Sequence, residues 1–173
     1  MKKFLFFLIC VLSLGSASLQ AATSRNDLLV AARALGFMTS PLTGNLTAGI
    51  VYDPSIARSA ADAKNIQSIM QGGFRVGNTT LTPVLVPISE AGSASAQLFI
   101  LAEGTGGSAS TLASICIRRR MLCMTADINQ VNRGSCALGV QSNPKVEILV
   151  NRNSAMRSGI EFSTAFRMMI TEV

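Results

Sequence analysis

Short apolar segments alternate in this chain with stretches whose apolar residues recur at helical spacing, and this alternation restricts the possible folds most. The segments 46–52, 97–102 and 121–125 are nearly uninterrupted apolar runs. Strands of this kind are typical of parallel sheets that helices cover on both faces. We therefore predict an α/β fold, a single Rossmann-like three-layer domain with a mixed, mostly parallel sheet.

The remaining segments complete this pattern. The expected helices span residues 25–38, 55–71, 108–119, 153–158 and 163–170, with a turn or short helix over 127–133. The expected strands are the three apolar runs together with 74–76, 81–86, 135–140 and 145–151. Pro83 and Pro87 favour an edge position for strand 81–86, because proline cannot donate a ladder hydrogen bond. The last two strands form a C-terminal β-hairpin, in which we expect Val146, Ile148 and Val150 to face the core.

The first 21 residues have the composition of a secretory signal peptide. Lys2 and Lys3 precede a short apolar core and then a run of small residues, and the core is shorter than the roughly 20 residues that span a bilayer. We expect cleavage after Ala21 or Ala22, which leaves residues 22–173 as one domain in the periplasm, not embedded in a membrane. Cys10 lies inside the apolar core and not at the cleavage site, which argues against a lipid anchor.

Charge and residue usage argue against several classes of function. Loss of Lys2 and Lys3 lowers the formal net charge from +6 to +4, and the basic run 118–120 has no interleaved aromatic residues, so we expect no nucleic-acid partner. The chain has no histidine and no Cys-x-x-Cys, which removes the usual zinc ligands and the commonest general base. Its carboxylates are scattered singly. We therefore predict a protein that is not an enzyme, with no catalytic residue, metal or cofactor.

Three cysteines remain after the leader is removed. In an oxidising compartment an odd number favours one disulfide and one thiol. Cys123 lies within an expected strand and Cys136 opens a strand that could be its neighbour. We predict the bridge Cys123–Cys136, with Cys116 reduced and buried. The alternative is that all three are buried thiols.

One loop has the position of a phosphate-binding loop. Its residues Gly104, Thr105, Gly106, Gly107 and Ser108 follow an expected strand and open an expected helix. The loop lacks the spacing of the dinucleotide and P-loop fingerprints, so an ordinary connection in which Ser108 caps the helix is the favoured interpretation. Asp53 and Asp127 also follow strands, and we expect them to form turns or helix caps.

The C-terminal third carries a specific pattern. It runs through Asp127, Gly134, Asn151, Ala155 and Gly159, with the hairpin strand 145–151 between the two glycines. This order resembles the closing signature of the YfiR-like family of periplasmic proteins. The resemblance extends over roughly residues 27–171, but this chain lacks the tryptophan that the family usually carries after its first helix. Asn151 is expected to cap a helix and Gly159 to end it.

The resemblance implies a regulatory or adaptor protein that acts by protein–protein contact. The family's best-known member represses an inner-membrane diguanylate cyclase, so the expected partner is the periplasmic part of a membrane signalling protein of that kind, such as a diguanylate cyclase or a sensor. The alternative is a small-ligand receptor that resembles one lobe of a periplasmic solute-binding protein, with residues 104–108 as its anion loop. A hydrolase is disfavoured because the chain has no Gly-x-Ser-x-Gly elbow.

Overall fold

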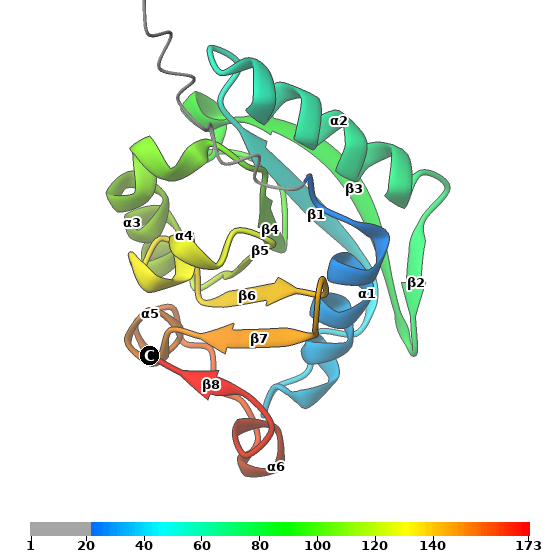
Figure 1. Cartoon of the computed structure of the whole chain (residues 1–173), viewed down its shortest axis with the longest axis vertical. Helices are drawn as coiled ribbons and strands as arrows, with labels where there is room; N and C mark the ends of the chain where they lie inside the picture. The colour runs from blue at the N-terminus through cyan, green and yellow to red at the C-terminus, as the bar shows by residue number, and fades with distance from the viewer. Residues whose placement is uncertain (1–21) are drawn as a thin grey trace, which may run out of the picture.

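The computed structural model describes residues 22–173, and the predicted signal peptide lies outside these residues. Its centre is an eight-stranded sheet with the order β2-β3-β1-β4-β5-β6-β7-β8 (Figure 1). The strands are β1 (Gly44–Tyr52), β2 (Phe74–Val76), β3 (Thr79–Pro87), β4 (Leu98–Leu101), β5 (Leu122–Thr125), β6 (Leu138–Gln141), β7 (Glu147–Val150) and β8 (Thr171–Glu172). Neighbours from β3 through β6 pair in parallel, whereas β2 pairs with β3 and β7 with β6 in the antiparallel sense. The prediction of a mixed, mostly parallel sheet with a C-terminal hairpin is confirmed.

Helices cover both faces of this sheet. They are α1 (Arg25–Ala34), α2 (Ala57–Met70), α3 (Ala109–Arg119), α4 (Ile128–Asn132), α5 (Arg152–Arg157) and α6 (Thr164–Arg167). One apolar core joins α1 and α2 to the sheet, and the other joins α3 and α4 to its opposite face (Figure 1). All four residues of β4 are buried because alternate side chains enter opposite cores: Leu98 and Ile100 the first, Phe99 and Leu101 the second.

The strand order creates a crevice next to β1. After β1 the chain crosses through α2 to β3 on one side, and it later returns to β4 on the other side. The loops that leave β1 and β4 therefore diverge to opposite faces of the sheet. This arrangement is the topological switch point at which α/β domains gather ligands, at the carboxyl ends of the strands.

The disulfide prediction is confirmed. Cys123 on β5 is bonded to Cys136, which lies just before β6, with 5.0 Å between their Cα atoms. Cys116 on α3 is a buried free thiol. A disulfide of this kind is typical of an oxidising compartment.

The edge position predicted for strand 81–86 was wrong, although its prolines do lie where one side of the strand has no neighbour. β3 lies between β1 and β2 and is not an edge strand. However, β2 pairs only with Thr79–Leu81, so Pro83 and Pro87 lie beyond its reach. The side of β3 that faces away from β1 is therefore unpaired where the prolines occur, which is why they are tolerated.

The face predicted for the C-terminal hairpin was also partly wrong. Val150 is buried, but Val146 is exposed and Ile148 is only partly buried. Leu149, assigned to the outer face, is buried in the second core. Because helices cover both faces of the sheet, a residue of β7 is buried or exposed according to its position along the strand more than according to the face on which its side chain lies.

Two smaller differences concern the ends of helices. The first helix ends at Ala34 and continues as a 3-10 turn to Phe37, and α6 is followed by the short strand β8, which was not predicted. None of the helices in residues 22–173 is long and apolar enough to cross a membrane.

Candidate functional site

The loops at the switch point enclose a polar cavity of about 190 Å³. Its walls come from the start of α2, from the loop after β4 and from α4 with its flanking residues, and consist of Arg58, Glu103, Gly104, Gly106, Gly107, Asp127, Asn129 and Arg133. Three of the five residues predicted as an anion loop therefore line one cavity. The other two do not: Thr105 is buried, and Ser108 is absent from the lining.

Two arginines lie directly against the glycines of this loop. Gly104 has a φ of +81°, and a Cβ on it would lie 3.2 Å from Nε of Arg58. A Cβ on Gly106 would lie 3.2 Å from Nη1 of Arg133. Glycine at these two positions thus lets each guanidinium group lie close to the backbone of the loop. Planar guanidinium groups of this kind suit a carboxylate or phosphate oxygen pair.

Hydrogen bonds from neighbouring helices hold the loop in place. The carboxylate of Asp62 on α2 accepts the backbone N–H of Glu103 at 2.9 Å. The hydroxyl of Thr105 donates to the carbonyl of Ala102 and lies 3.1 Å from Oε1 of Gln130. The loop is therefore fixed to both α2 and α4.

Ser108 does not have the role predicted for it. Its side chain makes no capping hydrogen bond to α3, because a 3-10 turn over Thr105–Ser108 leads into the helix and places Ser108 outside the extended conformation of a typical cap. The predicted helix start near Ser108 is correct, but the cap is not.

Negative charges balance the two arginines of the cavity. Glu103 and Asp127 face the same space as Arg58 and Arg133. Burial raises the pKa of the Glu103 carboxyl, the charge of Asp62 raises it further, and Arg58 opposes both effects. The cavity is thus a polar candidate site whose wall carries charges of both signs. The residues that line it include no serine, cysteine or lysine nucleophile, and no three histidine, cysteine or acidic residues within 22–173 could hold a metal ion.

The two aspartates predicted to form turns or caps do so. Oδ1 of Asp53 accepts the backbone N–H and the hydroxyl of Ser55, which starts the turn into α2. Oδ1 of Asp127 accepts the N–H of Asn129 and caps α4. Asp127 combines this role with its place in the cavity wall.

The residues of the C-terminal signature form one structural unit. Oδ1 of Asn151 accepts the N–H of Ser154, and its Nδ2 donates to the carbonyl of Val131. Ser154 in turn donates to the carbonyl of Gly134, which has a φ of +75°. Asn151 therefore caps α5, as predicted, and also ties α5 to α4.

The other end of α5 follows the signature as well. Ala155 is buried in the first core, and its carbonyl accepts the N–H of Ile160. Gly159 has a φ of +69° and ends the helix in the left-handed conformation, as predicted. These residues shape the C-terminal part of the domain.

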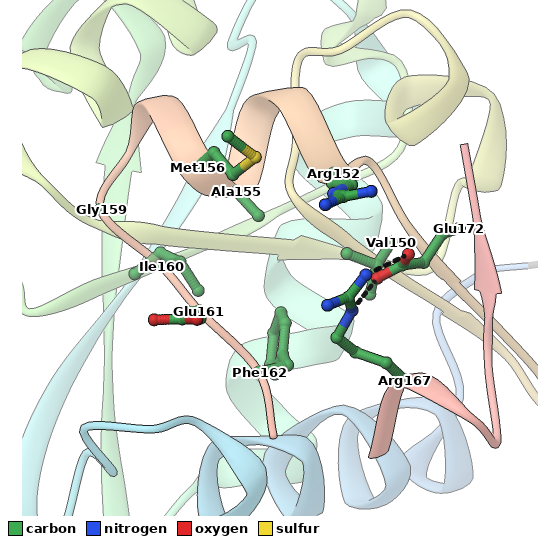
Figure 2. A pocket seen from close by; sticks show the side chains of 10 residues that line it. All are labelled: Val150, Arg152, Ala155, Met156, Gly159, Ile160, Glu161, Phe162, Arg167 and Glu172. Atoms are coloured by element: carbon green, nitrogen blue, oxygen red, sulfur yellow. Dashed lines mark hydrogen bonds and ion pairs between the residues drawn. The ribbon is translucent and has the colours of Figure 1, made fainter. Parts of the chain in front are cut away.

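A second cavity, which we name the C-terminal groove, was not anticipated from the sequence. It measures about 480 Å³ and lies between α5, the segment 159–162 and the α6–β8 turn (Figure 2). Its wall is lined by Val150, Arg152, Ala155, Met156, Gly159, Ile160, Glu161, Phe162, Arg167 and Glu172. Arg167 donates to both carboxylate oxygens of Glu172, at 2.6 and 3.0 Å, and so closes one side of the groove.

Exposed apolar side chains lie on α5, which lines this groove, and on the segment from α6 to the chain end, and we name them the C-terminal face. Their exposed fractions are 66% for Met156, 83% for Met168 and 64% for Met169, and Val173 is also exposed. Phe37 joins them because its half-exposed ring stacks on Phe166 of α6 with 5.0 Å between the ring centroids. The Met-Met pair in the sequence was the signal that could have revealed this face.

Comparisons with known proteins identify the fold but no family. No family model matches this chain, and neither does any curated protein. Among solved structures, the chain is similar to a ligand-free, open substrate-binding protein with adhesive properties from Clostridium difficile, with a TM-score of 0.56 and 11% identity. The similarity covers 73% of this chain and 54% of that protein, so the chain spans about half of its length. At this identity the similarity shows a shared α/β fold alone.

Proposed function

We propose that this protein is an exported, non-enzymatic regulator or adaptor that works in the periplasm by protein–protein contact. Its partner is the periplasmic part of an inner-membrane signalling protein, such as a diguanylate cyclase or a sensor. The YfiR-like order of residues from Asp127 to Gly159 supports the family, and the disulfide supports an oxidising compartment.

The observation that carries the proposal is the C-terminal face. Five exposed apolar side chains lie on α5, on the segment from α6 to the chain end, and on the 3-10 turn that stacks on α6: Phe37, Met156, Met168, Met169 and Val173. Met156 lines the groove itself, and Asn151 caps the helix that carries it. Clustered exposed apolar residues mark protein-binding surfaces, and flexible methionines suit such surfaces because they adapt to a partner. The arginine and carboxylate side chains in the groove would supply the polar contacts around this apolar centre.

Site-specific photo-crosslinking in intact cells tests this proposal. A photoreactive amino acid at Met168 should give a covalent adduct with one inner-membrane signalling protein, identified by mass spectrometry. The same amino acid at Val84, an exposed residue of β3 away from the C-terminal face, serves as the matched control. Equal adducts from both positions, or adducts at Met168 with a second copy of this chain alone, would contradict the proposal.

A second candidate function is supported by the switch-point cavity. Its two arginines, its glycine loop and its position at the carboxyl edge of the sheet suit a small ligand with an anionic group. Similarity of fold to a substrate-binding protein agrees with this candidate. Under it, the domain senses or captures a small molecule.

Gly107→Asp separates the two functions. A Cβ on Gly107 meets no atom within 4 Å, so the variant should fold as the parent does. Native mass spectrometry of protein purified from the periplasm would reveal a bound small molecule. A small molecule that is bound to the wild type and lost in a well-folded Gly107→Asp variant, together with no partner adduct at Met168, would favour the receptor function over the regulator.

A further inference from the structure

We propose that removal of the leader creates an α-ammonium group that forms an ion pair with the buried carboxylate of Asp62. This pair helps to hold in position the loop after β4, residues 103–108, which we name the switch-point loop. The proposal rests on the predicted cleavage, not on the identity of a partner or ligand.

The atoms involved lie in a closed cluster at the start of the described chain. The backbone nitrogen of Thr23 lies 2.8 Å from Oδ1 of Asp62, and its hydroxyl lies 2.9 Å from Oδ2. Both residues are buried, with exposed fractions of 4% and 2%. Nδ2 of Asn65, one turn further along α2, donates to the carbonyl of Thr23 at 2.7 Å. Thr23 is thus held at its nitrogen, hydroxyl and carbonyl before α1 begins.

Asp62 is buried among neutral donors. Its hydrogen bonds come from the amide and hydroxyl of Thr23 and from the amide of Glu103. No lysine or arginine within residues 22–173 forms an ion pair with it. The carboxyl of Glu103 is close enough for the charge of Asp62 to raise its pKa, and Arg58 and Asp127 also act on Glu103. A buried carboxylate beside a second acid is costly unless a cation lies next to it.

Cleavage supplies such a cation. Hydrolysis by a leader peptidase consumes one water, leaves a carboxylate on the leader and frees an α-amine on this chain, which is mostly protonated at neutral pH. If Thr23 is the first residue, the ammonium is the atom already 2.8 Å from Oδ1. If Ala22 is the first residue, the ammonium lies one peptide unit away, on an exposed residue. In the precursor the same position holds an uncharged amide.

The ion pair would connect cleavage of the leader to the switch-point cavity. Oδ2 of Asp62, which accepts the hydroxyl of Thr23, also accepts the N–H of Glu103, the residue before Gly104. A cation at or next to Thr23 attracts the Asp62 carboxylate and so keeps it in position to accept the N–H of Glu103. We therefore expect the switch-point loop to be less firmly held in any form of the protein whose amino terminus is extended.

A double-mutant cycle on exported protein tests the pair. Intact mass first identifies the cleaved bond. A Gly-Ser-Gly-Ser segment inserted after that bond then moves the α-ammonium away from Asp62 but keeps an amide N–H at Thr23 that can donate to Asp62. The segment should lower the equilibrium constant for folding about ten-fold or more, measured by urea unfolding, because hydrogen bonds to charged groups exceed neutral ones. In the Asp62→Asn background the same segment should have little effect.

The outcomes separate clearly. A mature chain that begins before Ala22, or an equal effect of the segment in both backgrounds, would overturn the proposal. If Asp62→Asn does not fold, the acylation rate of the α-amine replaces the cycle: at neutral pH it should be about ten-fold slower in the folded protein than in a peptide that begins at the same first residue and ends at residue 26. A rate equal to that of the peptide would also overturn the ion pair.

Discussion

Asn151 links two elements through one side chain. It caps α5 by accepting the N–H of Ser154 and donates to the carbonyl of Val131 at the end of α4. Asn151→Ala should lower the free energy of unfolding by about 1–2 kcal/mol, because the cap and the link are both lost. Asn151→Asp keeps an acceptor for the cap and loses only the donor, so it should cost less. Urea unfolding of both variants measures the difference, and equal costs would show that the cap contributes nothing.

The thiol of Cys116 should be unreactive in the folded protein. Burial raises its pKa to about 11, with Arg119 acting in the opposite direction, so little thiolate forms at neutral pH. Iodoacetamide should leave the native protein unlabelled and should label Cys116 alone after denaturation without reductant. Peptide mapping reads the result. Labelling of Cys123 or Cys136 under those conditions would contradict the disulfide.

Single residues were predicted from sequence where their role is local. Asn151 and Gly159 act within one helix and its ends, and the Cys123–Cys136 bridge joins strands that follow one another in the chain. The role of Asp62 was missed because its partners Thr23 and Glu103 are brought to it by tertiary packing. The two arginines of the cavity were missed for the same reason, since nothing local connects Arg58 or Arg133 to the glycine loop.

At the scale of elements, α1 is joined to the C-terminal hairpin through Asp27. Its carboxylate accepts the backbone N–H of Ser142 at 2.7 Å, in the turn between β6 and β7, and that of Ser24 at 2.8 Å. Burial alone would raise the pKa of Asp27, but the hydrogen bonds from Ser142 and Ser24 lower it overall. Asp27 thus fixes the first helix against the hairpin.

This lowered pKa predicts an acid-sensitive contact. A carboxyl whose folded pKa lies below its unfolded value stabilises the fold above the unfolded value and loses that contribution as the pH falls through the folded pKa. Wild type should therefore exceed Asp27→Asn in stability at pH 7, by about 1–3 kcal/mol. The gap should narrow once the pH falls below the ordinary value of 3.8. A pH-independent gap between wild type and Asp27→Asn would contradict the account.

Most elements were predictable because each has its own periodicity or apolar run. Their neighbours and burial were harder to predict. The three-residue strand β2 pairs with β3, so β3 is not at the edge, and β7 has buried residues on both of its faces. The two-residue strand β8 exists through its pairing with β7, from Leu149–Thr171 to Val150–Glu172, and has no signal of its own. Pairing partners distant in the sequence decide such details.

At the scale of the whole molecule, the switch-point cavity and the C-terminal groove are separate and share no lining residue. The switch-point cavity lies where the strand order reverses, and its glycine loop was considered as an anion loop in the sequence only as the alternative to an ordinary connection. The C-terminal groove requires α5, α6 and β8 to meet, and this could not be foreseen from any single segment. Its exposed methionines are the basis of the proposed regulatory contact.

The level of cyclic di-GMP in cells that lack this protein tests that contact most directly. If the partner is a diguanylate cyclase that this protein represses, the level should rise on deletion and return to normal with the wild-type gene. A Met168→Glu, Met169→Glu double variant should not restore it, although its urea midpoint and periplasmic amount should match the wild type, because both side chains are exposed. Val84→Glu, equally a change of an exposed apolar residue, should restore it fully. An unchanged level on deletion would exclude repression of a diguanylate cyclase, and full restoration by the methionine variant would contradict regulation through the C-terminal face.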